Sequence, residues 1–242
     1  MRQHALAPAI RYADAAAQRA AKVATYSATL VRFQRRVTPQ GLQPAERSRM
    51  QLKIRSQPFS VYMKFEEPAA GREVMYIDGW NQNRLIVHEG SGPLSFVGTI
   101  SLDPKSPRAM ESGRPITQAG LANLARGVAD EWRDAIARGL TTDETTVQFF
   151  PEAMLGDVEV EAIETTMARR VTSTNTHKLR LFLTRDSKLP IAMQAYAFPP
   201  QQGGRPASTE PELREDVRYL QLDVRTPLNA RDFDPENPAY DF

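Results

Sequence analysis

Several residue types and motifs that support catalysis are missing from this sequence. Its 242 residues include no cysteine, which excludes disulfides, thiolate metal sites and cysteine nucleophiles together. There are three histidines, His4, His88 and His177, and no two of them have the spacing of zinc ligands. The G-x-S-x-G turn of serine hydrolases and the glycine-rich phosphate loop with its lysine are also missing. We therefore expect no enzyme, no metal and no cofactor, and a hydrolase acting on envelope material is disfavoured.

Long apolar runs and clusters of one charge are missing too. No stretch approaches the ~20 apolar residues that a membrane-spanning helix needs. The 31 basic and 29 acidic residues nearly cancel, whereas nucleic-acid-binding domains usually show clustered Lys and Arg. The start, MRQHALAPAIRYADAAAQ, does not have the charged and then apolar pattern of an export signal. The chain is therefore expected either to be cytoplasmic or to have had an export signal removed.

Alternation of apolar and polar residues dominates what is present. In RMQLKIR, Met50, Leu52 and Ile54 alternate with charged and amide side chains, and FSVYMKF repeats the pattern with an apolar residue at every second position. A period of two is typical of half-buried antiparallel strands. Similar segments over residues 25–102 and 144–226 predict ten or eleven strands in one sheet. A sheet with this many strands tends to curl or close.

Two helical segments interrupt the strand pattern. Residues 9–24 are rich in alanine and predict an N-terminal helix. Within residues 103–139 a loop with several prolines and glycines comes first, and one apolar stripe on a long helix follows. That stripe consists of Ile116, Leu121, Leu124, Val128, Trp132 and Ile136. We interpret the loop as a lid that leads from the sheet into the central helix.

The remaining segments complete a single predicted domain over residues 1–242. Residues 199–212 are turn-forming and polar, which favours a hairpin loop, and residues 227–242 form an irregular tail that aromatic side chains hold in place. The sequence thus predicts an α+β fold built on one large, curved antiparallel sheet. We expect this sheet to be an unclosed half-barrel whose concave face is covered by the N-terminal and central helices.

Three carboxylates on one predicted strand form the first candidate site. Asp157, Glu159 and Glu161 share a face, about 6–7 Å apart at neighbouring positions. Such a set can bind calcium or act in acid–base chemistry. Because Val158 and Val160 alternate with them, a solvated outer face is the favoured interpretation.

Methionine is the second candidate feature, because it is spread widely over strands and loops. Its flexible, polarizable side chain suits surfaces that accommodate varied apolar shapes. The alternative is that each methionine fills a gap in a core. Together with a curved sheet under a helical lid, the set is compatible with an apolar cavity. The residues concerned are Met50, Met63, Met75, Met110, Met154, Met167 and Met193.

Three stretches give the chain a family resemblance from about Ala24 onward. They are FSVYMKFEEPAAGREVMYIDGWNQNRLIVHEG, LDPKSPRAMESGRPITQAGL and the terminal DFDPENPAYDF. They resemble the bacterial domain family DUF1571, which in turn is similar to the LolA/LolB-like superfamily of periplasmic lipoprotein carriers and receptors. The resemblance implies an unclosed barrel with helices in its mouth, an apolar cavity for acyl chains, and export to the periplasm or cell envelope. No lipobox cysteine is present, and the family has no established activity to carry over.

The pattern and the resemblance together favour a non-enzymatic carrier of lipid or acylated lipoprotein. The alternative is an envelope interaction or sensor module of the same fold that holds a partner protein. For a carrier, Arg114 at the mouth is expected to bond loop carbonyls or to meet a lipid headgroup. The expected cavity residues are Met50, Leu52, Ile54, Val61, Met63, Phe65, Met75, Met110, Ile116, Leu124, Trp132, Leu181, Leu183 and Leu222.

Overall fold

The computed structural model describes most of the chain. The described residues are 4–38, 41–90, 98–110, 114–171, 175–199, 201–202, 205–206 and 210–242. None of the described helices is both long and apolar enough to cross a membrane.

The described residues form two α-helices and fifteen strands. The helices are α1 (Ala7–Ala21) and α2 (Leu121–Ala137), and short 3-10 turns lie at η1 (Asn81–Asn83), η3 (Ile116–Gln118) and η4 (Ala230–Phe233). The strands of the first half are β1 (Thr25–Gln34), β2 (Val37–Thr38), β3 (Gly41–Leu42), β4 (Glu46–Arg55), β5 (Ser60–Glu67), β6 (Glu73–Ile77), β7 (Leu85–His88) and β8 (Ile100–Leu102). Those of the second half are β9 (Thr145–Leu155), β10 (Val158–Met167), β11 (Thr176–Thr184), β12 (Pro190–Ala197), β13 (Gln201–Gln202), β14 (Arg205–Pro206) and β15 (Glu212–Asp223).

Eleven of these strands form one sheet, and the other four form two short ribbons. The order in the sheet is β8-β7-β6-β5-β4-β1-β15-β12-β11-β10-β9, which leaves β8 and β9 as its edge strands. Each neighbouring pair whose register is known is antiparallel. The predicted α+β class, the strand number and the open sheet are confirmed. The predicted hairpin over residues 199–212 contains the β13–β14 ribbon, and the rest of it lies largely outside the described residues.

By compactness the chain divides into two units made of interleaved segments. The first, called here the helix unit, consists of Met1–Ala20, Arg32–Glu46 and Leu121–Arg218. The second, called the tail unit, consists of Ala21–Val31, Arg47–Gly120 and Tyr219–Phe242. Each is described separately below.

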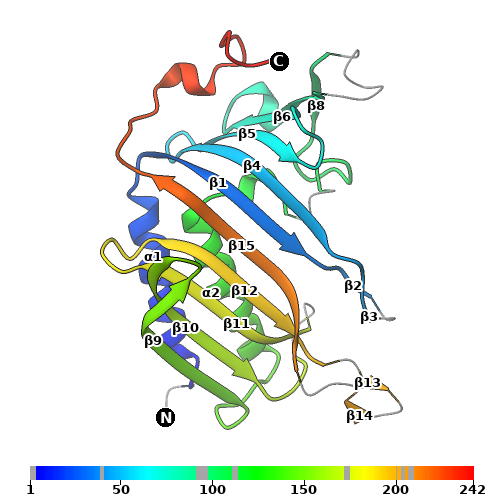
Figure 1. Cartoon of the computed structure of the whole chain (residues 1–242), viewed down its shortest axis with the longest axis vertical. Helices are drawn as coiled ribbons and strands as arrows, with labels where there is room; N and C mark the ends of the chain where they lie inside the picture. The colour runs from blue at the N-terminus through cyan, green and yellow to red at the C-terminus, as the bar shows by residue number, and fades with distance from the viewer. Residues whose placement is uncertain are drawn as a thin grey trace. The chain divides into compact units, whose positions relative to one another are not determined.

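In the helix unit both helices pack on one face of the sheet. α2 lies against β11 and β12, behind the strands as seen in Figure 1. Trp132 of α2 is fully buried, and its indole N–H donates to Thr165 Oγ1 of β10 at 2.8 Å. The rings of Tyr12 of α1 and Phe149 of β9 make a T-shaped contact, with their centroids 5.6 Å apart. Small alanines on α1 allow close approach, and Ala9, Ala13, Ala16, Ala17 and Ala20 are all buried.

Both predicted helices exist, with shifted bounds. α1 begins and ends before the expected residues 9–24, because the chain turns to extended backbone by Thr25. The expected long helix does not include Ile116, which lies in η3 instead. Gly120, with a φ of 98°, separates η3 from α2. A left-handed residue cannot continue a right-handed helix, so the apolar stripe spans two elements. β8 forms the last three residues of the predicted strand segment 25–102, and residues 91–97 lie outside the described part.

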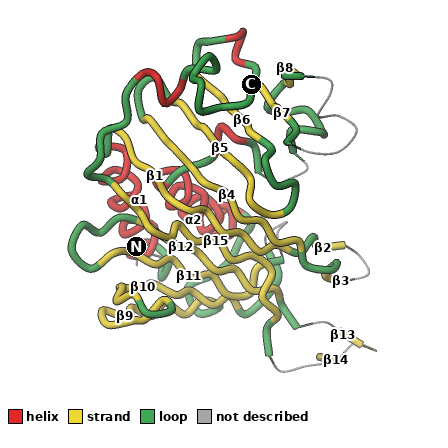
Figure 2. The backbone as a smooth tube through the Cα atoms, turned by 45° about the horizontal axis from the view of Figure 1, so that its top comes forward, coloured by secondary structure: helices red, strands yellow, loops and turns green. Residues whose placement is uncertain are grey.

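In the tail unit β4, β5, β6 and β7 form an antiparallel meander; Figure 2 shows these strands side by side. Two chain segments approach unusually closely where this meander turns. A Cβ atom built on Gly90 would lie 2.2 Å from the carbonyl carbon of Gly71. Because the obstructing atoms are backbone, no side-chain rotation relieves the clash. Arg72, next to Gly71, donates from Nε to Glu89 Oε2 at 2.7 Å and so holds the same two segments together.

We predict that Gly90→Ala destabilises the chain by about 3 kcal/mol, since the added methyl group forces the two backbones apart. The control is Gly98→Ala, where the added Cβ meets nothing within 4 Å. The control is expected to lose only about 1 kcal/mol, from its left-handed φ. Urea unfolding of both variants measures the difference. Equal losses would contradict a tight contact between Gly71 and Gly90.

Candidate functional site

One face of β4 and β5 is continuously apolar. Met50 pairs with Phe65, Leu52 with Met63 and Ile54 with Val61. Residues paired across antiparallel strands point to the same face, so these six side chains form one surface, called here the apolar face. Val74 and Tyr76 of β6 extend it, because they pair with Met63 and Val61.

Exposure across the apolar face is uneven. Met50, Leu52, Ile54 and Val61 are at most 2% exposed, so protein atoms surround them without a water-sized gap. Met63 is 8% exposed, and Phe65 and Val74 are half-buried. The accessible part of the face is therefore at Phe65 and Val74, next to the largely buried Met63.

The segment Ile116–Gly120 covers the opposite end of the apolar face. Gly120 N–H donates to Tyr219 Oη at 2.9 Å. A Cβ built on Gly120 would lie 3.2 Å from Ile54 Cδ1 and 2.6 Å from Tyr26 Oη, so the backbone here rests directly on the sheet. Ile116 itself is 7% exposed. Only a glycine permits both the close approach and the positive φ.

The other face of the same strands is covered by the C-terminal tail. Tyr62 pairs with Met75, and Met75 with Ile86, which places all three on this second face. They form an apolar cluster against which the partly buried Tyr240 and Phe242 pack. The Tyr62 and Tyr240 rings stack with centroids 4.0 Å apart.

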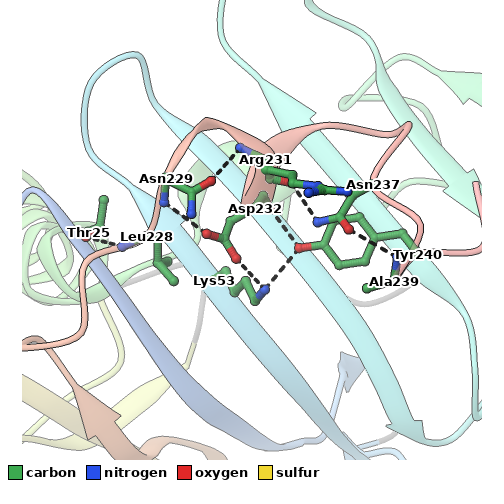
Figure 3. Close-up of polar contacts among 9 residues, drawn as sticks. All are labelled: Thr25, Lys53, Leu228, Asn229, Arg231, Asp232, Asn237, Ala239 and Tyr240. Atoms are coloured by element: carbon green, nitrogen blue, oxygen red, sulfur yellow. Dashed lines mark hydrogen bonds and ion pairs between the residues drawn. The ribbon is translucent and has the colours of Figure 1, made fainter.

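Polar contacts fix the tail in place, as Figure 3 shows. Lys53 Nζ donates to Asp232 Oδ1 at 2.7 Å and to Tyr240 Oη at 3.1 Å. Tyr240 Oη donates in turn to the Asp232 carbonyl at 2.9 Å. Asn229 and Asp232 form a capping box at the start of η4. Asn229 Oδ1 accepts from the Arg231 N–H at 2.8 Å, and Asp232 Oδ2 accepts from the Asn229 N–H at 2.9 Å. The tail is thus a hydrogen-bonded structure with a defined position on the strands.

A buried carboxylate makes a second polar anchor for the tail. Glu73 is fully buried; Lys64 Nζ lies 2.7 Å from its Oε1, and the Asp241 N–H donates to its Oε2 at 3.1 Å. The hydrogen bond with Glu73 raises the pKa of Lys64. Glu73 belongs to the GREV stretch and Asp241 to the terminal DFDPENPAYDF stretch. Two of the stretches that carry the family resemblance therefore meet at this anchor.

The electrostatics at Asp232 decide how the tail responds to acid. Burial alone would raise the pKa of Asp232, but hydrogen bonds from Lys53 and from the Asn229 backbone outweigh it and lower that pKa. Burial lowers the pKa of Lys53, and the bonds to Asp232 and Tyr240 raise it further than burial lowers it. Both groups are therefore charged at neutral pH.

The structure divides the predicted cavity residues between the two units. In the tail unit it brings together the six residues of the apolar face, and Ile116 is buried four residues before Gly120, which lies against Ile54. Met75 is separated from them, because it lies on the tail-covered face. Met110, Arg114 and Leu222 are half-buried in the same unit. Leu124, Trp132, Leu181 and Leu183 belong to the helix unit, where each is at most 5% exposed.

The three predicted carboxylates do not share a solvated face, so that interpretation was wrong for one of them. Glu161 is 6% exposed and accepts hydrogen bonds from Tyr12 of α1 and from Lys188. Glu159 is exposed and pairs with Arg185 at 2.7 Å. The α1 contact, which strand alternation does not reveal, buries Glu161. Among the described residues, no three His, Asp or Glu side chains are grouped to hold a metal ion.

Sequence reasoning did not identify Tyr26, Tyr219 or the tail-covered face as parts of this region. Tyr26 and Tyr219 are both buried beside Gly120. The aromatic residues in the terminal stretch were the one available signal for the tail, and they predicted that it is held down. They did not indicate which strands hold it.

This chain belongs to the family described as Protein of unknown function (DUF1571), whose model matches residues 23–242. The match confirms the family resemblance. No curated protein matches the chain.

Solved structures of similar chains have low sequence identity. An uncharacterized conserved protein from Thermus thermophilus is 10% identical, with a TM-score of 0.46 over 93% of this chain and 92% of that one. A putative outer membrane lipoprotein-sorting protein domain from Vibrio parahaemolyticus is 12% identical, with a TM-score of 0.36 over 93% and 95%. A LolA superfamily protein from Nitrosomonas europaea is 14% identical, with a TM-score of 0.36 over 92% and 97%.

We predict that acid loosens the tail. A carboxylate whose folded pKa is lowered stabilises the fold above its unfolded pKa of about 3.9 and loses this contribution as pH falls through the folded pKa. Amide hydrogen exchange of residues 229–242 should therefore quicken relative to the β4–β5 amides below about pH 4. Tail protection that is unchanged down to about pH 2 would contradict this account.

We also predict that Asp232→Asn reduces the free energy of unfolding by about 2 kcal/mol at pH 7, because a charge-assisted hydrogen bond from Lys53 is lost. The matched control is Asp234→Asn, whose carboxylate is exposed and accepts from the Glu236 N–H. Urea unfolding is the measurement, and the control is expected to change by less than about 0.5 kcal/mol. Equal effects would show that the Lys53 pair does not hold the tail.

Proposed function

We propose that this protein is a carrier that holds an acyl chain, of a lipid or of an acylated lipoprotein, on the apolar face. The observation that carries the proposal is that this face is continuous over β4, β5 and β6 yet accessible at Phe65 and Val74, beside Met63. An acyl chain gains about 0.8 kcal/mol for each methylene buried. Apolar contacts are non-directional, so one face of this kind accepts chains of different length.

The covering segment supplies a route for loading. Ile116–Gly120 lies on the buried end of the apolar face, where a guest longer than the open part has to go. The hydrogen bond from the Gly120 N–H to Tyr219 Oη is a polar contact that lifting this segment breaks. Exchange of Ile116 for the guest's methylenes replaces one apolar contact by another. The segment thus acts as the lid of the carrier, with Arg114 beside it to meet a headgroup.

The bound tail stabilises the second face of the strands that carry the apolar face. Strands whose second face is free can twist when a guest enters, whereas here Lys53 and Glu73 bind the tail to that face. We propose that the chain works in the periplasm or cell envelope, where lipids and lipoproteins pass between membranes. A carrier of this kind binds its guest without a chemical reaction, so it needs no catalytic group.

Displacement of a fluorescent fatty acid from the purified protein tests the carrier proposal. Met63→Gln places an amide of similar shape next to the accessible part of the apolar face, and an unpaired polar group in an apolar wall costs about 1–3 kcal/mol. We predict that the fatty acid binds about tenfold more weakly to this variant. Native mass spectrometry of the protein from cells should show co-purified lipid that the variant retains less well.

The matched control is Met154→Gln, the same change at a residue that is 58% exposed in the helix unit. It is expected to bind the fatty acid as the unchanged protein does. Far-ultraviolet circular dichroism checks that both variants fold. If the unchanged protein binds no fatty acid, or if Met63→Gln and Met154→Gln bind it equally well, the carrier proposal is wrong.

A further inference from the structure

Exposed apolar side chains gather on one hairpin of the helix unit. Seven large apolar side chains of the described residues are exposed, and four of them lie on β9 and β10. They are Phe149 at 51%, Phe150 at 38%, Met154 at 58% and Val158 at 51%. A cluster of this kind marks an interaction site more often than scattered surface residues do.

β9 is also an edge strand. In the described structure it pairs with β10 alone, over Thr145–Leu155, so its other side carries backbone groups available for a further strand. Natural proteins usually blunt such edges with short strands, lysine or proline. The other edge strand, β8, is short, with three residues. β9 has eleven residues, and its blunting devices, Pro151 and an irregular register opposite Val160 and Ala162, lie beyond Phe150.

The segment before Pro151 is suited to accept a strand. Thr145–Phe150 contains six uncharged residues, TTVQFF, which span about 20 Å in an extended chain. Phe149 pairs with Ile163 and Phe150 with Ala162, so the two rings lie on opposite faces of the sheet. An added strand would therefore contact a phenyl ring on each face, besides the backbone hydrogen bonds that give affinity.

Charge around the hairpin decides which occupant fits. The side chains of Glu152 and Glu159 are 81% and 68% exposed, and Asp157 is exposed as well. One cation, Arg185, lies near two of these carboxylates, at 2.7 Å from Glu159 and 3.8 Å from Glu152. The hairpin is therefore acidic, which favours a basic partner and disfavours an anionic lipid surface.

A second copy of this chain is a poorer match. Two β9 strands paired antiparallel about Gln148 would set Glu144 of each copy opposite Glu152 of the other. Glu144 already has a cation, since Arg169 Nε lies 2.6 Å from its Oε1, but Glu152 would gain no cation from that arrangement. Like charges directly opposite each other destabilise a strand pair.

We propose that the β9 edge docks an extended apolar segment of another protein, flanked by Lys or Arg, as an added β-strand. The backbone of Thr145–Phe150 supplies the hydrogen bonds. Phe149 and Phe150 contact the apolar side chains of the added strand. Glu152 and Glu159 form ion pairs with its flanking Lys or Arg. This surface is separate from the apolar face that carries the proposed function. A carrier that delivers its cargo to a partner needs such a second surface, but the inference stands without the carrier.

The test uses a synthetic ten-residue peptide of alternating valine and threonine with two lysines at each end. We expect nuclear magnetic resonance shifts and slowed amide exchange in Thr145–Phe150 on its addition. Glu152→Lys with Glu159→Lys should weaken binding about tenfold, because two attractive charges become repulsive. Phe150→Lys, which places a lysine on the edge, should weaken it at least as much.

Three comparison probes make the outcome decisive. A peptide with the same side chains but every backbone nitrogen methylated lacks the donors of a strand and should not bind. A glutamate-flanked peptide should bind at least about tenfold more weakly than the lysine-flanked one. Vesicles with phosphatidylglycerol should leave β9 unshifted. Equal binding of the methylated or acidic peptide, no binding of the lysine-flanked peptide, or vesicle binding through β9 would each overturn the proposal.

Sedimentation and the Met63 and Met154 variants complete the design. A concentration-dependent dimer that Phe150→Lys abolishes would mean that a second copy is the occupant, which also overturns the proposal. Met63→Gln should keep peptide docking while it weakens fatty-acid binding. Met154→Gln should keep fatty-acid binding. If the unchanged protein shows only one of the two activities, the proposal for the missing activity has failed.

Discussion

Burial of both faces of β4, β5 and β6 is the constraint on which the tail unit depends. A strand in an antiparallel sheet commonly has one buried and one solvated face, and the alternation in RMQLKIR follows that expectation. Here the polar face is covered as well, because Lys53 and Lys64 are neutralised by Asp232 and Glu73. Ion pairs and hydrogen bonds thus allow a tail to lie where charged side chains would otherwise require water.

The two faces are held by different kinds of interaction, and this difference bears on function. Contacts on the tail-covered face are directional: a stacked tyrosine pair, a capping box and a lysine that bonds two partners. The apolar face has mainly non-directional packing. Directional contacts specify one arrangement, whereas apolar packing tolerates exchange of one partner for another. The fold therefore combines a fixed tail-covered face with the apolar face that we propose accepts a guest.

Much of the fold was predictable from the sequence, because hydrophobic period is a local signal. The alternation at Met50, Leu52 and Ile54 and at Val61, Met63 and Phe65 indicated both the strands and their shared face. What failed depends on contacts distant in the sequence. Met75 alternates like its neighbours, and only the pairing with Tyr62 shows that it lies under the tail. Glu161 looks solvated until α1 is placed over it, and Ile116 looks helical until the φ of Gly120 is known.

Photo-crosslinking with a diazirine-labelled fatty acid identifies the residues that the acyl chain touches. We expect labelled peptides that contain Met63, Phe65 and Val74, with additional labelling near Ile116 when the acyl chain is longer. Labelling confined to the exposed side chains of β9, to the tail-covered face, or to no specific peptide would show that the apolar face does not bind the acyl chain.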